Sequence, residues 1–232
     1  MKTKVLAALS TLSLLGAATA SAAPPTPAGP THGGLEIDIR AGYSVPLGTA
    51  FTSAASGGSV DNKLKDATKG QIPIRLDVGW RINSHFYVGV YGGYGFGAVN
   101  LDSEQGKSCA QLGVECSISF IDFGVMGAYH VRPDQAFDPW VGLGVGYEMV
   151  KTRQTTSSVD TKGGFSGPTF VDVQLGGDYK ASPNVSIGPF VGFAVGQYSK
   201  CTGDAAASGC AIDTKTLHEW FTLGVKGTFG IW

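Results

Sequence analysis

Residues 217–232 read LHEWFTLGVKGTFGIW, and this last stretch of the chain decides the fold. Its residues alternate: an apolar row runs in steps of two from Phe221 to Ile231, and a second row contains His218, Thr222 and Lys226. Strict alternation is typical of a β-strand with one face in an apolar environment and the other in a polar one. A strand of this length needs neighbours on both edges, because a long unpaired edge invites aggregation. We therefore predict that this strand closes a barrel against the first strand.

Seven earlier stretches alternate in the same way and predict seven further strands, at 35–43, 72–82, 86–98, 121–131, 141–149, 171–179 and 185–195. Antiparallel strands that thread a membrane have short turns at one end and long loops at the other. The connections here follow that pattern, with short turns at 83–85, 132–138 and 181–184 and long polar loops at 48–70, 100–117, 153–167 and 199–215. The predicted fold is all-β: an eight-stranded antiparallel up-and-down transmembrane β-barrel.

The N-terminus has the pattern of an export signal. Two lysines, an apolar run and a small-residue site predict a secretory signal peptide over residues 1–22, cleaved between Ala22 and Ala23. The run is shorter than the roughly 20 apolar residues that a transmembrane helix needs. Residues 23–34 are rich in Pro and Gly and predict an extended linker. The barrel domain is then 35–232.

The amino-acid composition argues against some classes of function. The net charge of −1 gives no electrostatic basis for binding nucleic acid. Charged residues make up 15% of the chain, against about 25% in a typical soluble domain. Glycine occurs 35 times, about twice its usual share, and this excess needs a structural reason.

The four cysteines, Cys109, Cys116, Cys201 and Cys210, all lie after the predicted signal peptide. An even number in an exported chain predicts disulfides, and the spacings do not match those of zinc sites. Two of the four long loops, 100–117 and 199–215, each hold one pair, which favours Cys109 with Cys116 and Cys201 with Cys210. Cross-loop pairing, which would fold the two loops together as a lid, stays open.

Volume decides which row faces outward. In a soluble eight-stranded barrel the apolar row would fill the lumen, but about forty mostly large apolar side chains would overfill it. Glycine is concentrated in the other row, where the large aromatic side chains of Tyr87, Tyr91, Trp140, Phe190 and Trp220 could stack into the gaps. We predict that the apolar row faces lipid and the glycine-rich row faces the lumen.

Aromatic residues of the apolar row are found near the strand ends, as in the interfacial girdles of membrane barrels. The predicted turn-side girdle is Trp80, Phe86, Tyr129, Tyr179 and Phe229, and the loop-side girdle is Tyr43, Tyr94, Phe96, Tyr147, Phe193 and Phe221. The strand length between the girdles, tilted by about 40°, spans about 25 Å, the height of an outer-membrane barrel.

The lumen row carries nearly equal numbers of acids and bases, which should pair in a narrow space of low polarity. We predict a plug of ion pairs that makes the barrel rigid, rather than an ion pathway. Its members are Glu36, Asp38, Asp77, Asp122, Glu148, Asp172 and Asp178 against Arg40, Arg75, Arg81 and Lys226, with Arg132, Lys180 and His130 near the turn end.

Catalysis is not predicted. A membrane hydrolase needs Ser, His and an acid close together near the surface. Ser44 and His218 are the one Ser and His pair that the predicted strand pairing brings near each other, and both belong to the lumen row, with no acid aligned. We expect no cofactor and no metal.

The alternating architecture, the Gly-aromatic strands FYVGVYGGYGFG (86–97) and PWVGLGVGYE (139–148) and the aromatic C-terminus resemble the small outer-membrane β-barrels of Gram-negative bacteria: the OmpA transmembrane domain, OmpX and the opacity-type barrels. The resemblance covers residues 35–232. It implies location in the outer membrane, insertion by the assembly machinery of that membrane, and contact with its lipid and lipopolysaccharide.

The resemblance leaves the function open, because barrels of this shape serve several roles. We expect a monomeric, non-enzymatic scaffold that presents four long loops to an extracellular ligand. The alternative is a narrow pore or conduit for small hydrophobic molecules.

Overall fold

Strands account for most of the described chain. A computed structural model describes residues 33–55, 58–103, 106–107, 109, 114–156, 160–204, 212 and 214–231. The predicted signal peptide, its cleavage site at Ala22 and Ala23 and nearly all of the predicted linker lie outside these residues. Within them, no helix is long and apolar enough to cross a membrane.

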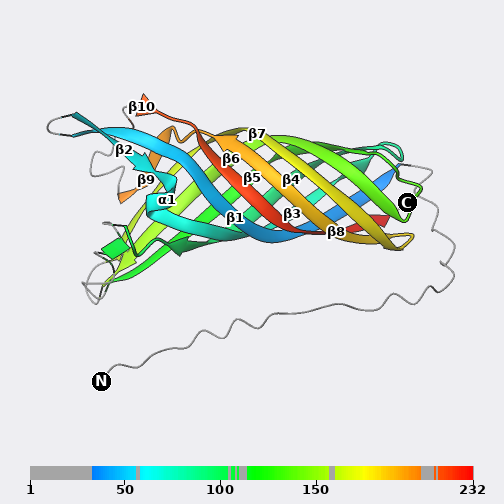
Figure 1. Ribbon diagram of the computed structural model, residues 1–232, viewed down its shortest axis with the longest axis horizontal. Coiled ribbons are helices and arrows are strands. Elements are labelled where there is room, and N and C mark those ends of the chain that lie inside the picture. The colour runs from blue at the N-terminus through cyan, green and yellow to red at the C-terminus, as the bar shows by residue number, and fades with distance from the viewer. Residues whose placement is uncertain are drawn as a thin grey trace, which may run out of the picture.

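Eight long antiparallel strands form a closed ring (Figure 1). Around the ring the order is β1, β11, β8, β7, β6, β5, β4 and β3, and β3 pairs again with β1. The all-β, eight-stranded, up-and-down prediction is confirmed. The bounds are β1 Gly34–Ala55, β3 Thr68–Arg81, β4 Phe86–Val99, β5 Glu115–His130, β6 Phe137–Thr155, β7 Asp160–Ser182, β8 Val185–Gly196 and β11 His218–Ile231.

The C-terminal strand closes the barrel as predicted. β11 pairs with β1 without a break from Leu35 opposite Ile231 to Gly48 opposite His218. On its other edge β11 pairs with β8, so both edges are hydrogen-bonded. Such closure removes the exposed strand edges of an open sheet.

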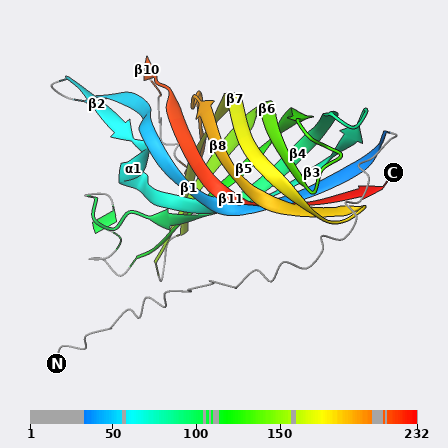
Figure 2. The same ribbon diagram turned by 45° about the vertical axis from the view of Figure 1, so that its right-hand side comes forward.

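The loop end differs from the prediction, because much of what the sequence suggests to be loop is hydrogen-bonded strand. β1 continues to Ala55 and turns back as β2, Gly58–Lys63, before the short helix α1, Leu64–Ala67 (Figure 2). β6 and β7 stay paired from the barrel out to Thr155 opposite Asp160. The short strands β9, Lys200–Gly203, and β10, Thr214–Lys215, pair with β7 and β1. We call this part, residues 47–69, 115–120, 149–166 and 197–217 as far as described, the strand extension.

The two rows face the directions predicted. The apolar row is exposed on the outer wall, for example Ile39 at 58% and Leu223 at 59%, whereas Glu36 and Asp38 in the other row are 1% exposed. Glycine makes room for aromatic rings inside: a Cβ on Gly176 would lie 2.5 Å from Trp140. The glycine excess therefore has a packing cause, because the lumen holds large rings only where the opposing wall lacks side chains.

The predicted girdle aromatics lie on the outer wall, where ten of the eleven are among the exposed large residues and Tyr147 is half-buried. Strand register brings several to one level: Phe86 lies opposite Tyr129 in the ladder, with ring centroids 5.1 Å apart. The outer wall also exposes Phe123, Phe137 and Phe170, which are not among the predicted girdle residues.

Candidate functional site: the barrel lumen and its loop-end mouth

A connected polar cluster closes the turn end of the lumen. Arg81 donates from Nε to Glu36 at 2.5 Å, and its Nη2 lies 3.1 Å from His130 Nε2. A guanidinium can only donate, so His130 Nε2 accepts and the imidazole is neutral. Its other nitrogen, Nδ1, then carries the proton and donates to Asp138 at 2.7 Å. All four side chains are buried.

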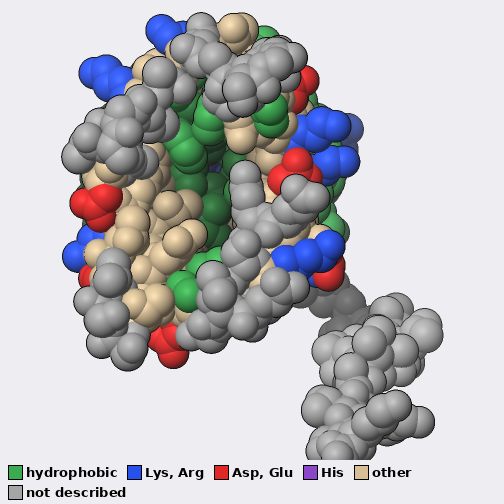
Figure 3. Space-filling model, turned by 90° about the vertical axis from the view of Figure 1, so that its left-hand side faces the viewer, with side chains coloured by type: hydrophobic (Ala, Val, Ile, Leu, Met, Phe, Trp, Pro, Cys, Tyr) green, Lys and Arg blue, Asp and Glu red, His purple; other side chains and the backbone are tan. Residues whose placement is uncertain are grey.

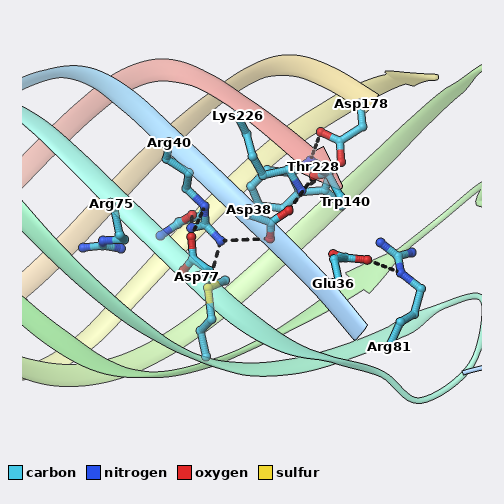
Figure 4. Close-up of polar contacts among 12 residues, drawn as sticks. Glu36, Asp38, Arg40, Arg75, Asp77, Arg81, Trp140, Asp178, Lys226 and Thr228 are labelled. Carbon is cyan, nitrogen blue, oxygen red and sulfur yellow. Dashed lines mark hydrogen bonds and ion pairs between the residues drawn. The ribbon is translucent and has the colours of Figure 1, made fainter. Parts of the chain in front are cut away.

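Further into the lumen, the carboxylate of Asp178 contacts two donor groups from different strands (Figure 4). Lys226 Nζ lies 2.8 Å from the Asp178 carboxylate, and Trp140 Nε1 donates to it at 2.9 Å. The ammonium of Lys226 also lies 4.1 Å from the centre of the Trp140 ring, a favourable cation–π distance. Beside this group, Thr228 donates to Asp38 at 2.5 Å.

Arg40 lies at mid-height and contacts three other strands. Its Nε lies 3.1 Å from Asp77 and its Nη2 lies 4.0 Å from Asp38 (Figure 4). Arg40 also donates to Gln174 on β7 and, at 2.9 Å, to the sulfur of Met126 on β5. This one side chain therefore ties opposite parts of the wall together.

Arg75 forms the next layer toward the loop end. Its guanidinium lies 2.7 Å from Asp122 and 2.6 Å from Asp172, and it lies 4.3 Å from the centre of the Tyr91 ring. Gln174 donates to Asp172 at 3.1 Å and links this layer to Arg40. A cavity of about 60 Å³ lies above the layer. Such a space holds only a few water molecules.

An aromatic layer closes this inner cavity from above. Phe120 and Trp220 meet edge to face, with ring centroids 5.1 Å apart. Tyr198, beyond the end of β8, stacks on His218 at 3.9 Å and donates to Glu148, whose carboxylate lies 3.5 Å from His218 Nε2. Burial raises the pKa of Tyr198 well above its usual range, so its hydroxyl keeps the proton that it donates.

The near balance of charge expected from the sequence is not found in these layers. Arg132 is exposed at the turn end, and Lys180 donates to the carbonyl of Pro133 instead of joining the network. Four cations, Arg40, Arg75, Arg81 and Lys226, therefore face the seven predicted acids plus Asp138. The described network carries an excess of carboxylates.

Above the aromatic layer the lumen widens into an apolar chamber, which we call the vestibule. Figure 3 looks into this loop end and shows hydrophobic side chains on the wall of the hollow. The vestibule has a volume of about 510 Å³. Its apolar lining is Ala50, Phe51, Val60, Leu64, Ala67, Ile118, Val150, Phe165 and Tyr198.

Ser44 and His218, which the predicted strand pairing brings near each other, contact different partners. The Ser44 hydroxyl lies 2.7 Å from the hydroxyl of Thr222, whereas His218 contacts Tyr198 and Glu148. Among the described residues, no group of His, Cys, Asp and Glu side chains is arranged to hold a metal ion.

Cys109 and Cys116 form the disulfide that the sequence favoured, with an S–S distance of 2.01 Å. Cys201 is also disulfide-bonded. Its predicted partner, Cys210, lies outside the described residues.

Sequence reasoning missed two central residues, Asp138 and Tyr198. Asp138 falls in the predicted turn at 132–138, but it lies at the start of β6 and its carboxylate contacts His130. Tyr198 lies two residues beyond β8, where the alternation has ended. Asp138 could have been found, because it is two residues before Trp140 and so belongs to the same lumen-facing row. The sequence around Tyr198 contains no such signal.

Comparison with known proteins places this architecture in a family. Residues 7–198, well over half of the chain, match the family described as outer membrane protein beta-barrel domain. None of the curated proteins with which the sequence was compared is similar enough to count as a match.

Solved structures of outer-membrane proteins are similar to the chain. A major outer membrane protein from Thermus thermophilus is 11% identical with a TM-score of 0.51, covering 86% of this chain and 99% of that one. Neisserial surface protein A is 14% identical with a TM-score of 0.48, covering 85% and 97%. OprG from Pseudomonas aeruginosa is 15% identical with a TM-score of 0.46, covering 87% and 99%. The chain belongs to the outer membrane protein beta-barrel family and is a protein of the outer membrane.

Proposed function

We propose that the protein is a non-conducting, non-enzymatic scaffold that holds the strand extension clear of the membrane for contact with an extracellular partner. Two features together carry this proposal. Successive polar and aromatic layers cross the lumen, and the hydrogen-bonded strand extension lies above them. In barrels of this class the short turns face the periplasm, so the strand extension faces outward.

The strand extension suits recognition because it is cross-linked rather than loosely looped. Arg153 forms a bidentate pair with Asp160 across the β6–β7 hairpin, at 2.8 and 2.7 Å. The backbone N–H of Lys162 donates to Asp204 at 2.7 Å, which ties β7 to the segment after β9. A preordered surface loses less conformational entropy on binding than a flexible loop does.

A conduit for small hydrophobic molecules is the second candidate, and the apolar vestibule is the observation that favours it. Against passage stand the layers below. A hydrophobic molecule that left the vestibule toward the turn end would have to displace Phe120 and Trp220 and then cross the paired charges of Arg75 and Arg40. Burying polar groups without partners is costly, so such passage is disfavoured.

The proposal is tested by shortening the β6–β7 hairpin and measuring adherence and solute flux side by side. Residues 152–163 are replaced by a tight Asn-Gly turn, and cells carrying either form are scored for adherence to immobilised matrix proteins and polysaccharides. We expect the shortened form to insert into the membrane and to lose adherence, with no solute uptake by vesicles carrying either protein. Unchanged adherence, or uptake through the unmodified protein, would contradict the proposal.

A further inference from the structure

Beyond the scaffold role, we propose that the vestibule is a binding site for a small molecule with an apolar body and an amine head group. The vestibule is a chamber between the strand extension and the aromatic layer, so it belongs to neither the ion-paired network nor the outer surface. Its volume of about 510 Å³ lies within the range of about 300–1,000 Å³ that is usual for small-molecule pockets.

The walls supply the apolar body with contacts from five elements. Phe51 from β1, Leu64 from α1, Ile118 from β5, Val150 from β6 and Phe165 from β7 all line the chamber. Phe51 and Phe165 lie against each other, with ring centroids 4.6 Å apart. Leu64 is only 3% exposed, so α1 turns its one leucine inward beside the mouth.

The aromatic layer closes the bottom of the vestibule and explains why a bound molecule would stay there. Phe120, Tyr198 and Trp220 are at most 4% exposed and belong to the same cluster as the walls. They separate the vestibule from the inner cavity, whose lining includes Phe120 and Trp220. A chamber that is apolar on its walls and closed below retains a ligand rather than passing it on.

The charge of the lining selects the head group. Three aspartates, Asp61, Asp66 and Asp102, line the vestibule against one lysine, Lys63. Asp61 accepts from Thr52 at 2.7 Å, and Asp102 is paired with Lys69 at 2.5 Å. Asp66 is half-buried and forms no ion pair with another described residue. Its carboxylate is therefore available to an amine and repels a carboxylate.

Three probes of equal chain length, hexylamine, hexan-1-ol and hexanoate, separate binding of the apolar body from recognition of the head group. The full barrel is placed in lipid nanodiscs, and the methyl resonances of Leu64, Ile118 and Val150 are followed during titration. Lipid-facing methyls of Leu76 and Val125 report partition into the bilayer. We expect hexylamine and hexan-1-ol to shift the methyl resonances of the vestibule and not those of the lipid-facing residues. Each added methylene should tighten Kd about fourfold until the chamber is full.

Head-group choice is the second readout. At low salt hexylamine should bind about fivefold more tightly than hexanoate, the effect of one exposed ion pair. Asp66→Lys, a change at the chamber edge that leaves the barrel wall intact, should reverse that order. Equal binding of amine and carboxylate, or an unchanged order in Asp66→Lys, would overturn the head-group assignment.

A matched pair of variants tests the site itself. Val150→Trp places a large ring in the chamber and should abolish the shifts of Leu64 and Ile118. Val145→Trp, on the same strand but facing lipid, should leave them unchanged. If the lipid-facing methyls shift as much as those of the vestibule in the unmodified protein, or if Val145→Trp abolishes the shifts, the site is refuted.

Discussion

The guanidinium of Arg75 on β3 lies 2.6 Å from the carboxylate of Asp172 on β7, directly across the barrel. In the ring of eight strands these two are four positions apart in either direction, so the ion pair spans the full width of the lumen. Arg75 reaches Asp122 on β5 as well, at 2.7 Å. One side chain therefore braces three strands, and its loss should be felt by the whole barrel.

Arg75→Ala should lower the free energy of unfolding by about 3 kcal/mol, because it leaves two carboxylates without their cation. This is the low end of the effect of breaking a buried pair, since the Arg75 side chain is 20% exposed and water reaches it. Urea unfolding in lipid vesicles, followed by gel mobility, measures the change. The matched control is Arg153→Ala, whose pair with Asp160 is exposed to water and should contribute far less to the free energy of unfolding than a buried pair. Equal effects of the two variants would show that the lumen pair is not buried in practice.

Periodicity predicted the strands and their faces, because an alternating pattern has only one apolar side. The pairing of β11 with β1 and the inward direction of Glu36, Asp38 and Lys226 followed from that pattern. Which charges meet did not follow. The partner of Arg75 across the lumen depends on the stagger of the strands, and no local pattern records the stagger.

The sequence of the strand extension predicts loops because it is polar on the outside, and because on β7 the inward-facing positions change between even and odd residue numbers. β7 has one extra residue where it pairs with β6: Gly144 lies opposite Asp172, but Gly146 lies opposite Thr169. On one side of this bulge Asp172 faces the lumen, and on the other side Phe165 lines the vestibule, although the two are an odd number of residues apart. A bulge that reverses the face of a strand breaks the alternation from which strands are predicted. The β7 wall of the vestibule could not be predicted for the same reason.

Gly176→Val should lower the free energy of unfolding by about 1–3 kcal/mol, the usual effect of overpacking an interior. A Cβ at this position would lie 2.5 Å from the Trp140 ring and 2.9 Å from the carbonyl oxygen of Pro189. The control is Gly227→Val, where a Cβ has no neighbour within 4 Å. We expect the control to unfold at the same urea concentration as the unmodified barrel. If Gly227→Val is as destabilising as Gly176→Val, the lumen packing does not explain the glycines.

Leu76→Arg should lower the free energy of unfolding by about 2–4 kcal/mol, because it places a charge on the outer wall near the middle of the bilayer. The control is Val60→Arg on β2, at the mouth of the vestibule in the strand extension, where the half-exposed side chain meets water. The two residues are similarly exposed, Leu76 at 48% and Val60 at 51%, so the exposed fraction of the side chain does not explain a difference between them. Folding yield into vesicles and urea unfolding measure both. A large effect at Val60 would place the membrane boundary further toward the loop end than the predicted girdle does.

Non-reducing peptide mapping should recover one peptide pair joined through Cys109 and Cys116, and a second joined through Cys201 and Cys210. The first pair is the disulfide described above, and Cys201 is also disulfide-bonded, which makes Cys210 the expected partner. A peptide that joins Cys109 or Cys116 to Cys201 or Cys210 would instead indicate a lid made of two loops.

The closed lumen is the central claim, and single-channel recording in planar bilayers tests it most directly. The unmodified protein, free of contaminating porin, should show no steady conductance, because the layers around Arg75, Arg40 and Trp220 fill the path between vestibule and turn end. Steady channel events from the unmodified protein, with an ion selectivity that changes in Arg75→Ala, would contradict the claim and favour a conduit.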